Sequence, residues 1–381
     1  MPRLTRFAIA ALVLAAPAAR AQNASIVYTL GKDTVAVETY TRTATKMSGE
    51  MVTRSGTAVA RTQYEFTMAG GRVTAAMMRR RGADGSIPAN TPTEWRFTFT
   101  ADSATRTTVW PDSAPARTFA AKQAFPTLPV FVYAPYELLQ AAAKAGGRRD
   151  SVPMIPTAGT QVGNTGIEAY AADTLRLRGT VPYAMLLRFD ADGRLLYTDG
   201  GYTTNKAIGR RAAKPVDIAA IAATMKPTGV LSPRQTAYAA FAQGPITINY
   251  GSPAVRERTV WGGTLVPFDT VWRTGANEAA HLATSKTLQL GDLTLAPGLY
   301  TLWIQHTRTA TWMIVNKQVG QWGTGYTAAN DLGRVAMTLA PTPAHVEDFT
   351  ITIRPVAGQP RGTFEFAWGD KVATAAFTVR P

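Results

Sequence analysis

Apolar and polar residues alternate along most of this chain, in short runs that end at Gly, Pro, Asn or Asp. In the first half, DTVAVETYTRTAT (33–45) and AVARTQYEFTMA (58–69) follow a two-residue period, and Gly70 and Gly71 supply a turn before the next run. A period of two places the apolar side chains on one face of a strand. The pattern therefore predicts antiparallel strands joined by hairpins.

Two segments of the first half have helical spacing instead. The run APYELLQAAAKAGG (134–147) places its leucines on one helical face, and Gly146 is a suitable stop. The run VDIAAIAATM (216–225) predicts a short second helix with Asp217 near its first turn. We therefore expect a β-rich N-terminal domain over residues 22–228, an antiparallel meander packed on a helix.

The alternation is more regular after the Pro- and Gly-containing stretch at 225–236. About nine short runs follow with no helix between them, and ITINYG (246–251) and FEFAWG (364–369) each place large apolar residues on one face. Strands at this spacing, joined only by turns, are typical of a β-sandwich. Residues 229–381 are predicted to form a jelly-roll-like sandwich, and six of the eight Trp lie there.

The first residues have the layout of a bacterial secretory signal peptide. Arg3 and Arg6 precede the apolar run 7–14, and Ala19-Arg20-Ala21 is a small-x-small cleavage site. The apolar run is too short to span a bilayer. We therefore predict that residues 1–21 are a cleaved leader and that the protein is exported, to the periplasm or beyond.

The chain has no cysteine. An exported protein of this composition has no disulfide, no thiolate nucleophile and no thiolate metal ligand. It also lacks the cysteine of a bacterial lipid anchor, so we expect a free protein rather than a lipoprotein. No later apolar run is long enough for a transmembrane segment after signal cleavage. The oligomeric state is not predicted.

The protein is basic, with a formal net charge of +15. Residues 22–231 hold 25 Lys and Arg against 16 Asp and Glu, whereas residues 232–381 hold 12 against 9. A basic exported protein is attracted to anionic surfaces and ligands. The short basic runs are more typical of solvated turns than of a specific nucleic-acid site.

The second half closely resembles a family of exported bacterial proteins known as domain of unknown function 2911. The motifs that carry this resemblance, in chain order, are SPR (232–234), ITINYGSPAVRERTVWGG (246–263), LVPFDTVWRTGANEA (265–279), LAPGLYTLW (295–303), WMIVNK (312–317), QWG (321–323) and FEFAWGD (364–370). The resemblance covers about 150 residues. It implies a compact exported β-domain and transfers no catalytic residue.

A dense group of polar and aromatic residues occupies 268–284. The candidate ligand-binding residues are Asp269, Trp272, Arg273, Asn277 and Glu278 in this group and Trp261 shortly before it. If the group is buried, Arg273 and Glu278 would brace a tight turn, and this is the favoured interpretation. If it lines a pocket, Arg273 would suit an anion and the two Trp a sugar ring.

Other chemistry has weaker support. His281 and His306 might meet Glu278 around a metal, but scattered histidines without a spacing motif do not predict one. No nucleophile elbow, P-loop or HExxH motif is present. We therefore predict no metal and no cofactor, and catalytic residues are not assigned.

The favoured function is a non-catalytic, envelope-associated protein that binds a glycan or another anionic envelope component. The alternative is a secreted hydrolase in which Glu278 or Asp269 acts with Arg273. A third reading is an adaptor whose basic first half docks to an anionic partner. Whether the protein is an enzyme is left open, with a non-enzyme favoured.

Overall fold

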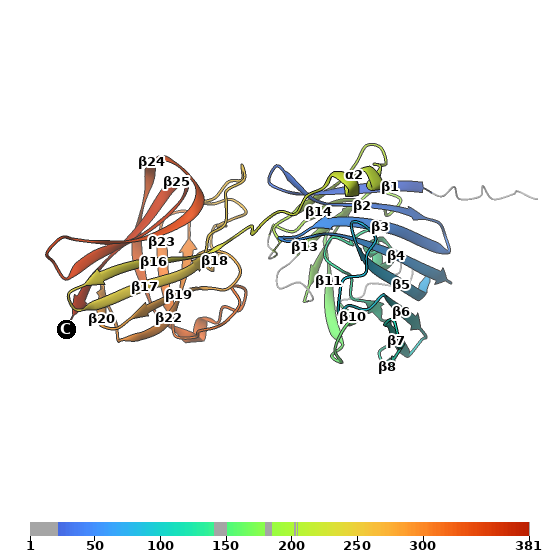
Figure 1. The fold of residues 1–381 in the computed structure, drawn as a ribbon, viewed down its shortest axis with the longest axis horizontal. Helices are drawn as coiled ribbons and strands as arrows, with labels where there is room; N and C mark the ends of the chain where they lie inside the picture. The colour runs from blue at the N-terminus through green and yellow to red at the C-terminus, as the bar shows by residue number, and fades with distance from the viewer. Residues whose placement is uncertain (1–21, 141–150, 180–184, 202, 204, 381) are drawn as a thin grey trace, which may run out of the picture.

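The computed structural model describes residues 22–140, 151–179, 185–201, 203 and 205–380. The predicted leader (1–21) and residues 141–147 of the helix predicted at 134–147 lie outside these residues. As predicted, the fold is mainly β, with 58% of residues in strands and 4% in helices, and it contains two large sheets. Figure 1 shows the two sheets as separate halves joined by an extended segment.

The first sheet is a 15-stranded meander in the order β8-β7-β6-β5-β4-β3-β2-β1-β15-β14-β13-β12-β11-β10-β9. Its strands are β1 (Gln22–Leu30), β2 (Asp33–Arg42), β3 (Lys46–Arg54), β4 (Val59–Ala69), β5 (Arg72–Gly82), β6 (Glu94–Phe99), β7 (Ser103–Val109), β8 (Ala116–Ala120), β9 (Phe125–Pro126), β10 (Ser151–Ile155), β11 (Gly163–Ala171), β12 (Thr174–Arg178), β13 (Met185–Phe189), β14 (Leu195–Asp199) and β15 (Ile208–Arg211). Neighbouring strands pair antiparallel except β9 and β10, which are parallel. The first strand pairs with the last, so that Ile26 faces Arg211 at the middle of the sheet.

Alternation explains the core of this half. In β4 the even-numbered residues from Ala60 to Met68 are buried, while Gln63, Glu65 and Thr67 are more exposed. Gly70 and Gly71 form the predicted turn between β4 and β5, with φ of 58° and 74°. The sheet curves strongly (Figure 1), and its buried apolar face surrounds one cluster of core residues.

The segment 131–140 contributes to that core. Residues 136–140 are helical, and Leu138 and Leu139 are buried among the sheet's core residues. The second predicted helix is present as α2 (Ile218–Thr224), and the Asp217 side chain caps it by accepting from the backbone N–H groups of Ala219 and Ala220.

Buried carboxylates attach this segment to the sheet. Glu38 accepts hydrogen bonds from the hydroxyls of Tyr28 (2.7 Å) and Tyr64 (2.8 Å) and from the backbone N–H of Ala134. Burial raises the pKa of Glu38 to about 7, although these hydrogen bonds favour its charged form.

Glu137 is the second of these carboxylates and is fully buried. It forms an ion pair with Arg42 at 3.0 Å and accepts from the Tyr40 hydroxyl and the backbone N–H of Leu195. Arg194 lies 3.5 Å away. Every described contact of this carboxylate is therefore with a donor, as a buried charge requires.

The second sheet has the order β16-β17-β19-β22-β23-β24-β25-β20-β21, and β18 pairs with β22. Its strands are β16 (Arg234–Phe241), β17 (Gly244–Gly251), β18 (Val271–Trp272), β19 (Ala280–Thr284), β20 (Thr287–Leu290), β21 (Leu293–Leu295), β22 (Gly298–His306), β23 (Thr311–Asn316), β24 (Asp331–Pro355) and β25 (Arg361–Arg380), with a 3₁₀ turn η1 (Ala328–Asn330). The long strands β24 and β25 shift register twice. These irregularities let the path bend, so that β16 and β24 come into contact without pairing.

The first sheet ends at Arg211 and the second begins at Arg234, with α2 and an extended stretch between them. None of the helices in the described part of the chain is long and apolar enough to cross a bilayer.

Candidate functional site

The polar turn at 268–280 is held tightly against neighbouring backbone. Asn277 adopts the left-handed conformation expected for it, with φ of 63°, and Gly275 has φ of 142°. The carbonyl of Asn277 accepts from the N–H of Gly323 at 2.8 Å. A Cβ on Gly251 would lie 2.3 Å from the carbonyl oxygen of Ala276, so only glycine permits this approach.

The two tryptophans of the candidate site belong to an aromatic cluster. Trp272 stacks on Trp368 with ring centroids 5.5 Å apart, and Phe349 packs edge-on at 5.1 Å. Trp261 donates its indole N–H to the carbonyl of Trp368 at 3.1 Å. Both candidate tryptophans are buried, so they act chiefly as core residues rather than as an open wall for a sugar.

The charged residues of the turn do not form one cluster. Arg273 is only 7% exposed. Glu278 has a half-exposed side chain, and its ion pair is with Arg234 at 3.3 Å rather than with Arg273 as the brace interpretation supposed. Asp269 is exposed, and its backbone N–H donates to the carbonyl of His306. The turn is therefore braced mainly by backbone contacts.

Arg273 faces a pocket of about 370 Å³ between the two halves. Residues of the N-terminal half, the connecting segment and the second sheet all line it. Among the described residues of its wall, four are cations: Lys206, Arg256, Arg258 and Arg273. Trp272 and Asn277 also line it, whereas Asp269, Glu278 and Trp261 are not among the described residues of its wall.

Two of these cations have carbonyl partners. The Lys206 ammonium donates to the carbonyls of Gly201 and Thr264, both at 2.9 Å, and the second bond crosses from one half to the other. Arg258 donates to the carbonyls of Val255 (2.9 Å) and Ala254 (2.8 Å). Carbonyls satisfy the donors without neutralising the charges. Asp199 near Lys206, and Glu347 and Asp33 near Arg258, offset the positive charges only in part.

The pKa values of Lys206 and Arg258 are lowered by burial and by the neighbouring cations. Burial, with the charges of Arg273 and Arg258, lowers the pKa of Lys206 to about 7. Burial, with the charge of Arg256, lowers the pKa of Arg258 to about 10. The lowered pKa values mean that the protonated forms of these two groups are destabilised where they lie. A negative charge bound beside them would therefore be stabilised.

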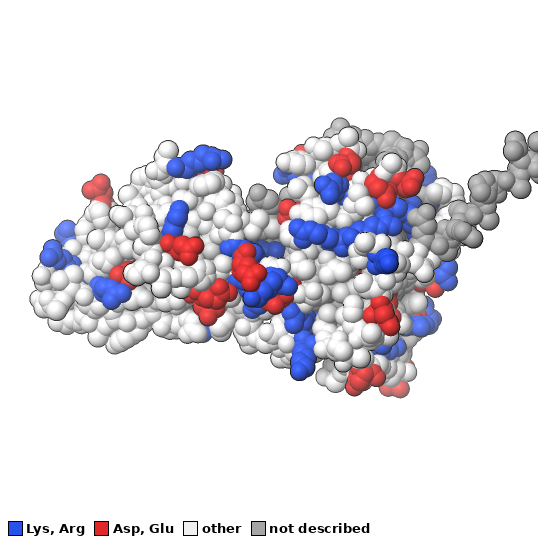
Figure 2. Space-filling view, turned by 90° about the horizontal axis from the view of Figure 1, so that it is seen from above, with Lys and Arg blue, Asp and Glu red and all other residues white. Residues whose placement is uncertain are grey.

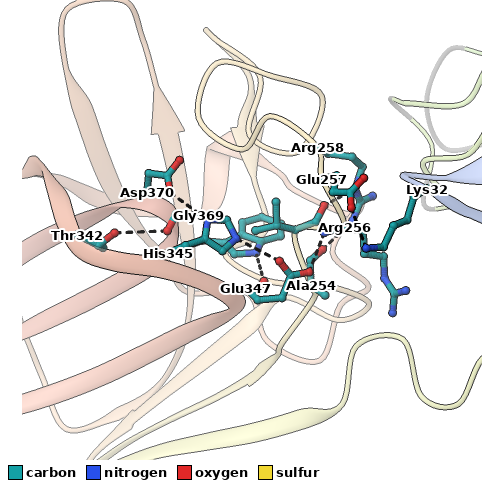
Figure 3. Close-up of polar contacts among 12 residues, drawn as sticks. Lys32, Ala254, Arg256, Glu257, Arg258, Thr342, His345, Glu347, Gly369 and Asp370 are labelled. Carbon is teal, nitrogen blue, oxygen red and sulfur yellow. Dashed lines mark hydrogen bonds and ion pairs between the residues drawn. The ribbon is translucent and has the colours of Figure 1, made fainter.

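Arg256 connects this pocket to a network across the junction (Figure 3). Its guanidinium forms an ion pair with Asp33, and beside it Lys32 pairs with Glu257 at 2.8 Å. The N–H of Arg256 donates to Glu347 at 2.9 Å. Figure 2 shows acidic and basic side chains next to one another on the surface where the halves meet.

His345 extends the network along the second sheet. It lies 2.9 Å from Asp370 and 3.1 Å from Glu347, and its hydrogen bonds to these carboxylates, that with Asp370 first, raise its pKa. Among the described residues, no group of three His, Asp or Glu is arranged to hold a metal. His281 bonds to backbone at Ala279 and Gly320, and His306 to Thr311.

Sequence reasoning identified Arg273, Trp272 and Asn277 but missed the other cations. Arg256 and Arg258 lie in the AVRERTVW run of the family resemblance, and an alternating Arg-Glu-Arg beside a Trp was the available signal. Lys206 had no such signal, because it lies about 60 residues earlier and reaches the pocket only through the tertiary structure.

Residues 232–377 match the model of a family described as "Protein of unknown function (DUF2911)". The C-terminal half carries this domain. The DUF2911 domain contributes Arg256, Arg258, Trp272 and Arg273 to the pocket, and Lys206 comes from outside it.

No curated protein matches the chain. One solved structure that aligns with this chain comes from a study of botulinum neurotoxin type C, whose entry into cells depends on interaction with two ganglioside molecules. It aligns with 95% of this chain and 89% of its own at 7% identity. Its TM-score of 0.11 is too low to relate the two folds.

Proposed function

We propose that this is an exported binding protein that holds a small anionic ligand between its N-terminal half and its DUF2911 domain. One observation carries the proposal: Lys206, Arg258 and Arg273 converge on one pocket, and the first two are hydrogen-bonded to carbonyls rather than paired with carboxylates. A ligand carboxylate or phosphate would supply the missing negative charge. The predicted leader supports export.

The pocket also suits a ligand of modest size. Its volume of about 370 Å³ lies within the range of small-molecule sites. Leu265 and Trp272 give it apolar walls beside the cations. An arginine fork recognises carboxylate or phosphate oxygens with defined geometry. We therefore propose the acidic sugars of envelope glycans, carboxylated or phosphorylated, as the ligand class.

The arrangement favours binding over hydrolysis. The acids of the hydrolase alternative, Glu278 and Asp269, are not among the described residues of the pocket wall. Glu278 is instead committed to Arg234 at the surface. A general acid or base has to reach the reacting group directly or through one water.

Calorimetric titration tests the proposal with four probes: galacturonate, glucose 6-phosphate, galactose and glucose. We expect the two anions to bind and their neutral counterparts to bind at least tenfold more weakly. Binding of the anions should weaken with added salt, since the contact is ionic. Equal affinity for neutral and anionic sugars, or no binding by either anion, would refute the proposal.

Variants locate the site. Arg258→Met and Lys206→Met should each lower anion affinity about tenfold or more, because each removes a charge-assisted contact. Lys122→Met is the matched control, since that side chain is 83% exposed and does not line the pocket. An equal loss in all three variants would indicate a general effect of net charge instead.

A further inference from the structure

The N-terminal half contains a second cavity, of different chemistry, inside the curl of its sheet. Its volume is about 380 Å³. The inner wall consists of buried core side chains, namely Phe99, Phe125, Leu138, Leu139, Val152 and Ile167. They come from β6, from β9–β11 and from the helical segment 136–140, which are distant in the strand order. The cavity is therefore formed by the curvature of the sheet.

The rim of this cavity is open, and Arg72 lies on it. The β4–β5 turn, Ala69 to Arg72, lies on the rim. No atom lies within 4 Å of a Cβ built on Gly70 or Gly71, so the turn leaves free space there. Arg72 is exposed, and it is the one charged residue among the described residues that line the cavity.

We infer that this cavity binds a single-chain amphiphile of the fatty-acid class, with the aliphatic chain against the buried wall and the carboxylate at Arg72. The apolar inner side chains offer no partner to a polar ligand atom, so a polar ligand would lose its hydration there. A hydrocarbon chain gains free energy with every methylene removed from water. The Arg72 guanidinium matches a carboxylate with two parallel donors.

This site is independent of the junction pocket. Among the residues that the structure describes, the junction pocket presents four cations, whereas this cavity presents an apolar inner wall, the polar side chains of Thr74, Thr100 and Gln123, and the single cation Arg72. The two described linings share no residue.

The first experiment is calorimetric titration with hexanoate, octanoate and decanoate below their micelle concentrations, and with decanol. We expect affinity to rise roughly tenfold for every two added carbons until the cavity is filled, and decanoate to bind more tightly than decanol. Affinity that does not depend on chain length, or no binding by any of the acids, would overturn the inference.

Two variants place the ligand. Arg72→Met should remove the preference for decanoate over decanol, while Arg80→Met, an exposed arginine on the same strand, should leave it intact. Val152→Phe should fill the cavity and abolish decanoate binding, yet leave galacturonate binding at the junction unchanged. If circular dichroism shows that Val152→Phe does not fold, the preference of Arg72→Met for decanoate over decanol tests the inference by itself, because Arg72 is exposed. Unchanged chain-length dependence and head-group preference in Arg72→Met would place the acid elsewhere.

Discussion

The curled interior of the N-terminal half and the junction pocket both hold ionised side chains away from water, but with opposite partners. Inside the curl, Glu137 is surrounded by an arginine, a tyrosine hydroxyl and a backbone N–H. At the junction, Lys206 and Arg258 point at carbonyls and lie near other cations. Glu137 is held in an ion pair with Arg42, whereas Asp199 acts on Lys206, and Glu347 and Asp33 act on Arg258, too weakly to offset burial and the neighbouring cations, so both pKa values are lowered. A buried charge with a bonded partner of opposite sign indicates a structural role, and buried cations whose protonated forms are destabilised favour a binding site.

Glu137→Leu should have the largest effect on this comparison. The substitution leaves Arg42, the Tyr40 hydroxyl and the Leu195 N–H without their shared acceptor, so we expect a loss of about 3–5 kcal/mol in the free energy of unfolding. Urea denaturation measures it. Glu65→Gln is the matched control, because it breaks an exposed ion pair with Lys46 and should cost less than about 1 kcal/mol. Equal losses in the two variants would show that the buried carboxylate contributes no more to stability than the exposed one.

Gly31→Ala should disturb the junction next most strongly. Gly31 has φ of 61°, and a Cβ there would lie 2.0 Å from the carbonyl oxygen of Arg256, so the halves must move apart. Gly291→Ala has the same backbone strain, with φ of 57°, but free space around the new methyl. We expect both to lose about 1 kcal/mol from strain, and only Gly31→Ala to lose anion affinity as well. Intact affinity in Gly31→Ala would show that the junction contact is dispensable.

Arg258→Met tests whether the cations of the junction pocket contribute to the stability of the fold. It removes a partly buried cation whose charged form is destabilised by burial and by Arg256, so the free energy of unfolding should stay within about 1 kcal/mol of the original or rise, even though anion affinity falls. Thermal or urea unfolding without ligand supplies the measurement. A loss as large as that of Glu137→Leu would mean that the junction cations serve the fold.

The pH dependence of binding should be the smallest effect. The pKa of Lys206 is lowered to about 7, so this group is protonated below pH 7 and loses its charge above it. Anion affinity should therefore fall severalfold between pH 6 and pH 8, and ligand binding near neutral pH should take up a proton. Calorimetry in two buffers of different ionisation enthalpy detects the uptake. Lys206→Met should abolish both effects.

The same group has a consequence for stability. The unfolded lysine keeps its proton up to its ordinary pKa near 10.5, so the unfolded state binds more protons than the folded state between about pH 7 and pH 10.5. Stability without ligand should therefore rise with pH across this window as far as Lys206 contributes. Urea unfolding at pH 7 and pH 9 checks the sign, and Lys206→Met should flatten the difference.

Local chemistry was readable from the sequence, and long-range geometry was not. Alternation predicted the two β-rich halves, and Asp217 was expected near the first turn of its helix, which it caps. The pairing of Glu278 with Arg234 was not foreseen, because the two lie 44 positions apart, Arg234 on β16 and Glu278 in the turn before β19. The junction pocket was missed for the same reason. Its cations come from segments far apart in the sequence, and the alternation of apolar and polar residues does not tell which segments meet.

The pairing of β1 with β15 has a consequence for the order in which the chain acquires structure. The opening strand cannot find both of its neighbours until residues near Arg211 have been made and have travelled back to it. Contacts between such remote positions form slowly, because a long loop must close before they contribute any free energy. A nascent chain built in this way keeps its first strand without one of its two final partners until residues near Arg211 have been made. Such a delay would suit the export that the sequence of residues 1–21 predicts, because an exported chain crosses the membrane before it folds.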